Sequence, residues 1–325
     1  MKKRRGWVLL PGITVLYALL CAVSPGFARR ALNGLSLPAM AALHRWTARA
    51  PFPVAELMAA GLASAAACAL VEALARAMAG RNAMPFKRWA AGVLRVSLAL
   101  ACALTLLWAP ARALPFEAPP VPNAEQLEAL CDALVTLLNA SPLRFDSAEA
   151  ALSAAPEVAG LPWTAVKAAR WPEWMRALRV SGLFVPLTGE AVADPGAPAP
   201  LVPFTAVHEL MHLRGIADEG AANIEAWRRC TEVDGPFADS ARLWALRYAL
   251  GMLGQADAPA RLRVYEKMKD PLRQVFHAVH GEASSAPAPA PLPGLVLTRG
   301  DYGAMVGALC IKSVECGEWS VECKE

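Results

Sequence analysis

The stretch LVPFTAVHELMHLRG, residues 201–215, places the pattern HExxH within an apolar segment. Residues four apart share one face of an α-helix, so His208 and His212 can present both imidazoles to one ion. Glu209 follows the first of these histidines and can accept a proton from a water molecule activated by that ion. The side chains around the three are apolar: Val207, Leu210, Met211 and Leu213. The stretch therefore predicts a buried zinc-binding helix rather than two histidines on a solvated face.

A third ligand is expected shortly after this helix, because a catalytic zinc site uses three protein ligands and keeps one position open. Gly215 is predicted to end the helix in a left-handed turn, after which the chain reverses through IADEGAAN. Asp218 and Glu219 both come within reach of the ion after such a turn. Glu219 is the favoured ligand because it begins a helix that carries Asn223 on the same face, where Asn223 can support a ligand. Asp218 remains the alternative, and a helix-terminal charge without a metal is the alternative for both.

The N-terminal third is apolar and basic, which is typical of a membrane anchor. Hydrophobic residues make up 56% of the 325 residues, and apolar stretches span residues 7–23, 54–79 and 89–109. Each is close to the ~20 residues that cross a ~30 Å hydrocarbon core. We therefore expect three transmembrane helices, a multi-pass location in the cell membrane, and the lipid bilayer as a partner.

Basic residues indicate the orientation of this anchor. One cluster precedes the first stretch and another surrounds the turn between the second and third: Lys2, Lys3, Arg4 and Arg5, then Arg76, Arg81, Lys87 and Arg88. Both clusters belong on the cytoplasmic side of a three-span protein, so the chain after residue 110 is expected outside the cytoplasm. The net charge is +4 and no basic tract is interleaved with aromatic residues, so no nucleic-acid partner is expected.

Composition divides the chain into an anchor (1–110), a proline-rich linker (111–122) and a domain of mixed polarity (123–325). Periodicity and turn signals predict a mainly α domain with a minor β element. The segment RVSGLFVPLTGEAVAD (179–194) is expected to be extended. Helices are expected at 124–140, 146–156, 163–178, 203–214, 219–233, 236–255, 258–268, 270–280 and 300–314.

Three further features of the domain bear on its chemistry. Tyr302 is a candidate for hydrogen bonding to an oxyanion, and a tyrosine that only packs is the alternative. Thr188, Gly189 and Glu190 are expected either to line a substrate cleft or to form a plain turn. No CxxC pair is present, so a structural zinc knuckle is not expected. The disulfide pattern stays open among five cysteines: Cys131, Cys230, Cys310, Cys316 and Cys323.

Several of these motifs resemble one known family. They are PLTGEA (186–191), PFTAVHELMHLRGIA (203–217), the ExxAN that begins at Glu219, Cys230, and DYGAMVGAL (301–309). Together they resemble an uncharacterised bacterial membrane-protein family, a domain of unknown function with N-terminal transmembrane helices and a HExxHxxG motif. The resemblance implies a zincin-like α+β metallopeptidase domain with a Zn²⁺ cofactor. Family members usually carry an acidic residue where this chain has Ala221, a departure that removes one alternative ligand and leaves Glu219.

These features predict a membrane-anchored zinc metallopeptidase that acts on a peptide or protein substrate, with Glu209 as general base. A non-catalytic, zinc-stabilised membrane sensor or scaffold is one alternative. The presence of Glu209 argues against it, because folding alone needs only the ligands. A zinc amidase that acts on cell-wall peptides is the other alternative. Neither cleavage specificity nor oligomeric state follows from the sequence.

Overall fold

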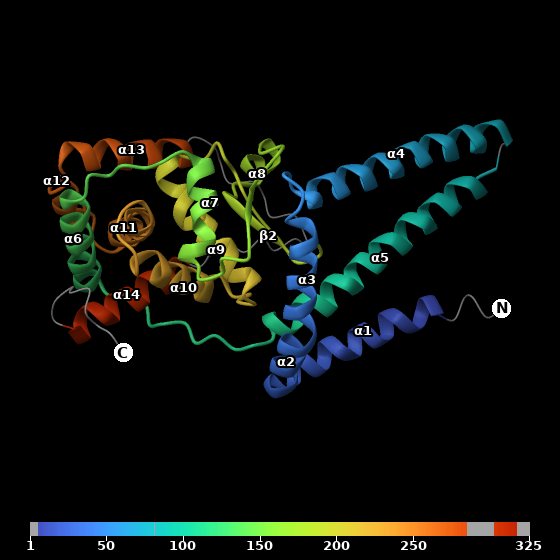
Figure 1. Ribbon diagram of the computed structural model, residues 1–325, viewed down its shortest axis with the longest axis horizontal. Helices are drawn as coiled ribbons and strands as arrows, with labels where there is room; N and C mark the ends of the chain where they lie inside the picture. The colour runs from blue at the N-terminus through green and yellow to red at the C-terminus, as the bar shows by residue number, and fades with distance from the viewer. Residues whose placement is uncertain (1–5, 81, 285–301, 317–325) are drawn as a thin grey trace. The chain divides into compact units, whose positions relative to one another are not determined.

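The chain forms two units in the computed structural model, which describes residues 6–80, 82–284 and 302–316 (Figure 1). The first unit comprises Met1–Pro115 together with the short segment Phe184–Glu190. The second comprises Phe116–Leu183 and Ala191–Glu325. Because Phe184–Glu190 lies inside the second half of the sequence, the chain passes between the units more than once.

Two long apolar helices dominate the first unit, α4 (Val54–Gly80) and α5 (Met84–Arg112). Both are long and apolar enough to cross a membrane, and large apolar side chains such as Val71 and Leu94 are exposed along them. The expectation of three such helices is wrong for the described residues. Two helices among these residues pass this test, and α1 (Gly6–Val23) contributes a shorter apolar stretch, Leu9–Val23.

The segment between α1 and α4 is helical and packs through one narrow stripe. It consists of α2 (Pro25–Ala31), the π-helix η2 (Leu32–Ser36) and α3 (Leu37–Thr47). A buried residue recurs every four positions: Ala28, Leu32, Ser36, Met40 and His44. This spacing places the five side chains on one face, and the three helices that carry them pack against α5.

The segment Phe184–Glu190 is held in the first unit by its own hydrogen bonds. The Nδ1 atom of His44 donates to the carbonyl of Gly189 at 2.8 Å. The Glu190 carboxylate accepts from the backbone N–H groups of Val54 and Ala55, at 2.8 and 2.7 Å. A carboxylate at this position satisfies unpaired donors and complements the positive end of the helix dipole. Glu190 therefore fixes the start of α4, a role that a cleft wall would not need.

The second unit is mainly helical and surrounds α9 (Val202–Leu213), every residue of which is buried. Helices α7, α10 and α11 pack directly against α9, and α6 packs against α11. The helices and their bounds are α6 (Ala124–Ala140), α7 (Ala148–Val158), α8 (Glu173–Leu178), η3 (Ala199–Leu201), α10 (Glu219–Thr231), α11 (Pro236–Ala256), α12 (Ala258–Glu266), α13 (Asp270–Ser284) and α14 (Tyr302–Cys316). The prediction of a mainly α chain is confirmed.

The minor β element is a three-stranded sheet with the order β1-β3-β2. Its strands are β1 (Val166–Ala168), β2 (Gly182–Val185) and β3 (Glu190–Ala193), and β1 runs parallel to β3 with Val166 opposite Ala191. The expectation of extended backbone in 179–194 is confirmed for β2 and β3, which a turn at residues 186–189 separates, whereas the single helix expected at 163–178 is wrong. Pro172 disfavours helical backbone at the residue before it, so a strand and the short α8 replace that helix.

Candidate metal centre

The motif helix α9 is held at its N-terminus by polar groups of α11 and ends at a glycine turn. At the N-terminus, Ser240 of α11 accepts from the backbone N–H of Phe204 at 3.1 Å. Trp244, also on α11, donates from its indole to the carbonyl of Leu201 at 3.2 Å. At the C-terminus, Gly215 has a φ of +93° and produces the predicted left-handed turn. These contacts set the position of the two motif histidines within the core.

Three metal-ligand types converge beside α9. The Nε2 atoms of His208 and His212 lie 3.1 Å apart. The Glu219 carboxylate lies 3.2 Å from the first and 3.6 Å from the second. Ligands at zinc–ligand distances near 2.05 Å in a tetrahedron are separated by about 3.3 Å. The three side chains therefore have the spacing of three corners of a zinc tetrahedron.

A hydrogen bond fixes the ring orientation of His212. Its Nδ1 atom donates to the carbonyl of Ile216 at 2.7 Å, across the turn that follows α9. A carbonyl can only accept, so Nδ1 carries a proton, and Nε2 is the atom that faces Glu219 and His208 and would bind an ion once it is deprotonated. Such a partner on the far nitrogen is typical of histidines that bind metals.

The Nδ1 atom of His208 and both side-chain amide atoms of Asn223 are buried without a hydrogen-bond partner. Asn223 nevertheless raises the pKa of His208 slightly, against a net lowering caused mainly by burial. Asn223 therefore lies close enough to His208 to act on its imidazole. A buried amide beside a ligand histidine fits the supporting role expected for Asn223.

The pocket favours a cation. Burial would lower the pKa of His212, but Glu219, Glu209 and the Ile216 carbonyl outweigh burial and raise it to about 9. Burial would raise the pKa of Glu219, yet the two histidines lower it well below its usual value. Without a metal, the cluster therefore retains a proton at neutral pH, and a divalent ion would take the place of that positive charge.

Glu209 is buried between α9 and the start of β2. A Cβ atom added to Gly182 would lie 2.8 Å from the Glu209 Cγ and closer still to its Oε1. The same atom would also lie 2.8 Å from the Thr205 Cγ2. Only glycine therefore leaves room at this position for the carboxylate. Since β2 is an edge strand of the sheet, the proposed base lies directly beside that strand.

Tyr302, the first residue of α14, belongs to a stack of aromatic rings. Its ring centroid lies 3.9 Å from Tyr248 and 4.9 Å from Trp244, with interplanar angles of 9° and 5°. Burial raises the pKa of the Tyr302 hydroxyl well above its usual value, and Tyr248, Glu209 and Glu219 act in the same direction. Tyr302 is thus within electrostatic reach of both carboxylates and stays protonated at neutral pH.

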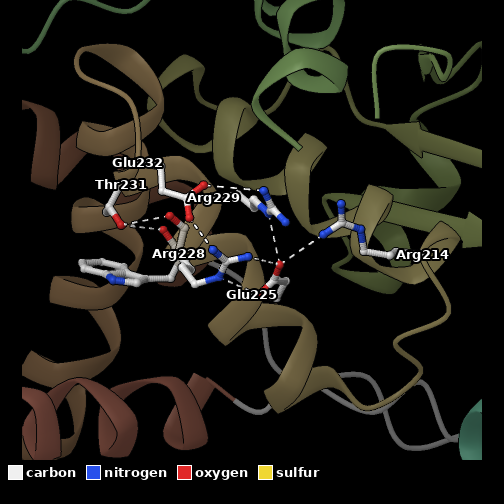
Figure 2. Close-up of polar contacts among 7 residues, drawn as sticks. Arg214, Glu225, Arg228, Arg229, Thr231 and Glu232 are labelled. Atoms are coloured by element: carbon white, nitrogen blue, oxygen red, sulfur yellow. Dashed lines mark hydrogen bonds and ion pairs between the residues drawn. The ribbon is translucent and has the colours of Figure 1, made fainter. Parts of the chain in front are cut away.

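An ion-pair network ties α10 to the C-terminus of α9. Figure 2 shows Arg214, Arg228 and Arg229 converging on the carboxylate of Glu225. Arg214 approaches at 3.3 Å and Arg229 at 3.1 Å, while the Arg228 guanidinium binds both oxygens at 2.6 and 2.9 Å. Because Arg214 follows α9 and Glu225 lies six residues after Glu219, the network holds α10 where Glu219 meets the histidines.

Comparison with known proteins adds the family. Residues 33–286 match the family described as "Protein of unknown function (DUF3810)". The chain belongs to this family. No curated protein and no solved structure matches the chain. The DUF3810 match begins in η2, covers all of α13 and includes the HExxH helix and Glu219, whereas Tyr302 lies beyond it. The expected resemblance to an uncharacterised family is confirmed. The description of this family assigns no activity.

Within this DUF3810 protein, the structure brings together His208, His212 and Glu219, with Glu209 and Tyr302 nearby. Asp218, the alternative ligand, is instead the N-cap of α10, where its carboxylate accepts from the backbone N–H of Ala221 at 2.9 Å. Cys131 and Cys230 are free thiols, the Cys310 thiol donates to the carbonyl of Gln126 at 3.7 Å, and nothing is described for the Cys316 side chain or for Cys323.

Sequence reasoning missed two neighbours of the DUF3810 centre. Gly182 was available as a glycine inside an extended segment, a position that often marks close approach of another group. The partners of Tyr302 on α11 were not identifiable, because periodicity places Trp244 and Tyr248 on one helix face without indicating what packs there.

Proposed function

We propose that the protein is a membrane-anchored zinc peptidase whose centre is held by His208, His212 and Glu219. The observation that carries the proposal is the spacing of 3.1, 3.2 and 3.6 Å among their ligand atoms. Two imidazoles and one carboxylate form a ligand set typical of catalytic zinc, which leaves a position open for water or substrate.

The chain's own residues supply the proton transfers. When bound, zinc contributes Lewis acidity toward the substrate carbonyl and toward water. Glu209 accepts the proton of the attacking water and returns it to the leaving amine. Its neighbour Gly182 leaves the space that this carboxylate occupies. Glu209 is thus assigned to proton transfer and not to metal binding.

Tyr302 is the proposed donor to the oxyanion that forms on the substrate carbonyl. A phenol donates only while it is protonated, and its raised pKa keeps it so at any physiological pH. Stacking on Tyr248 and Trp244 fixes the ring at low conformational cost.

The anchor is proposed to be a helical hairpin of α4 and α5. The basic residues near its turn favour the cytoplasm, so both outer ends of the hairpin face the other side. The second unit, which follows α5, is therefore proposed to work outside the cytoplasm. This inference rests on the basic residues at the turn between α4 and α5.

The decisive test compares zinc content with turnover in Glu209→Gln. This variant is expected to retain about one zinc per chain and to lose hydrolysis of peptides by about 10²–10⁴-fold, because Gln cannot accept the proton. His208→Ala, the matched control, is expected to lose both zinc and activity. A wild-type protein that binds zinc but cleaves neither peptides nor cell-wall amides would favour the sensor or scaffold. Cleavage confined to cell-wall amides would favour the amidase.

A further inference from the structure

Arg247 on α11 differs from the other half-buried arginines of the second unit. Arg214 and Arg229 pair with Glu225, and Arg242 pairs with Asp239. Among the residues that the structure describes, Arg247 forms no ion pair with a carboxylate, and its guanidinium lies over two aromatic rings. A half-buried guanidinium without an anion is costly, because solvation is lost without a compensating charge. An unpaired charge of this kind is typical of a site that receives an anionic ligand.

The contacts of Arg247 connect it to the candidate centre. Its guanidinium carbon lies 5.6 Å from the ring centroid of Trp244 and 5.9 Å from that of Tyr248. These are the two rings on which Tyr302 stacks. Arg247 acts on the Tyr302 hydroxyl, lowering a pKa that burial, Tyr248 and two carboxylates of the centre raise. The cation and the proposed oxyanion donor therefore share one aromatic cluster.

The helix face that carries Arg247 is open one turn further along α11. Gly251 lies one turn further along α11, on the same face as Arg247, and is exposed. No atom lies within 4 Å of the place that a Cβ of Gly251 would occupy. Trp244 and Tyr248 hold the guanidinium from the side of the cluster, so fewer rotamers are lost when an anion binds.

We propose that Arg247 is a specificity-determining residue that binds a carboxylate of the peptide substrate, next to the centre of the proposed peptidase. This inference rests on the proposed function for its substrate class. The guanidinium presents donors in a planar fork that matches a carboxylate, and the adjacent aromatic rings offer an apolar surface to the chain that carries it. The carboxylate comes either from the peptide's C-terminus or from an Asp or Glu side chain.

The test uses full-length, zinc-loaded protein in detergent and N-acetylated hexapeptides in matched pairs. One pair differs by a free or amidated C-terminus, and the other by Glu or Gln at each internal position. The wild type is expected to prefer one carboxylate form, in kcat/KM, by about 10- to 100-fold. Arg247→Gln is expected to abolish that preference, and Arg247→Glu to reverse it toward the uncharged member of the pair. The preferred pair identifies which carboxylate is bound.

The preference is a ratio within one enzyme, so any loss of folded protein cancels. Arg263→Gln is the matched control, because Arg263 also lies on a helix of this unit but pairs with Glu128 on the surface. An Arg247 that only stabilises the aromatic stack would lower stability and leave the ratio unchanged, which would overturn the proposal.

A second measurement separates this inference from the proposed function. Binding of the same peptides to Glu209→Gln protein, followed by tryptophan fluorescence, needs no turnover. Selective binding of the carboxylate forms that is lost in Arg247→Gln would support the inference even if the wild type hydrolysed nothing. Equal binding of carboxylate and amide forms would overturn it, whatever the fate of the peptidase proposal.

Discussion

The carboxylate of Glu209 lies in the space that a side chain at Gly182 would need. Strand β2 therefore approaches the motif helix so closely that its first residue must be glycine. The close contact between Glu209 and Gly182 therefore fixes the position of the proposed general base relative to the edge strand β2.

Gly182→Ala is expected to displace Glu209 or to push β2 away from α9. Peptide hydrolysis should fall by up to about 10²–10⁴-fold, the usual contribution of a general base. Zinc content, measured by metal analysis of the same sample, should stay near the wild-type value. Gly92→Ala in α5 is the control, since no atom would obstruct its Cβ. Equal activity of the two alanine variants would show that Glu209 does not need the space beside β2.

Alanine at positions 218 and 219 is expected to separate a helix cap from a metal ligand. Asp218→Ala removes the N-cap of α10 and should lower the free energy of unfolding by about 1 kcal/mol, with zinc retained. Glu219→Ala should instead reduce zinc affinity strongly, as judged by competition with a chelator. If Asp218→Ala lost zinc and Glu219→Ala kept it, the ligand assignment would be wrong.

The Glu225 network is expected to stabilise the protein in a pH-dependent way. Burial would raise the pKa of Glu225, but hydrogen bonds from Arg228 and Arg229 lower it below its usual value. A carboxylate with a depressed folded-state pKa stabilises above its unfolded pKa, and this contribution disappears as pH falls through the folded value. Glu225→Gln should therefore cost about 1 kcal/mol at pH 7, allowing for solvent screening, and progressively less below pH ~4.

This comparison is best made by urea unfolding of metal-free protein, so that zinc release at low pH does not contribute. Glu266→Gln is the control, because Glu266 is exposed on α12 and has no ion pair among the described residues. A destabilisation of Glu225→Gln that persisted unchanged at pH 3 would exclude the electrostatic explanation.

A reporter fused after residue 325 is expected to be active only outside the cytoplasm. The α4–α5 hairpin has basic residues near its turn, which the positive-inside tendency assigns to the cytoplasm. Alkaline phosphatase, which needs an oxidising compartment, should be active in this fusion, whereas green fluorescent protein should not fluoresce. Replacement of Arg81, Lys87 and Arg88 by Gln should weaken that bias. Strong fluorescence from the wild-type fusion would reverse the proposed orientation.

Local sequence patterns predicted many of the elements well. The extended segment 179–194 and the helices of the second unit followed from periodicity and capping signals, as with the capping box of Asn123 and Gln126 at the start of α6. The helix expected at 163–178 was wrong because a contact with a strand distant in sequence outweighed the local helix preference. Val166–Ala168 pairs with β3 instead of continuing a helix, because a partner distant in sequence satisfies its backbone groups.

The sequence by itself determined the HExxH helix, the turn at Gly215 and Glu219 as the favoured third ligand, because each depends on spacing within one helix or one turn. Only the tertiary structure decided that Asp218 caps α10. It also showed that the Glu209 carboxylate occupies the space that a side chain at position 182 would need. Arg247 and Tyr302 were likewise found to contact the same aromatic cluster. These relationships join residues tens of positions apart, or depend on which of two adjacent carboxylates points inward. No local periodicity encodes them, because they arise when separate elements pack.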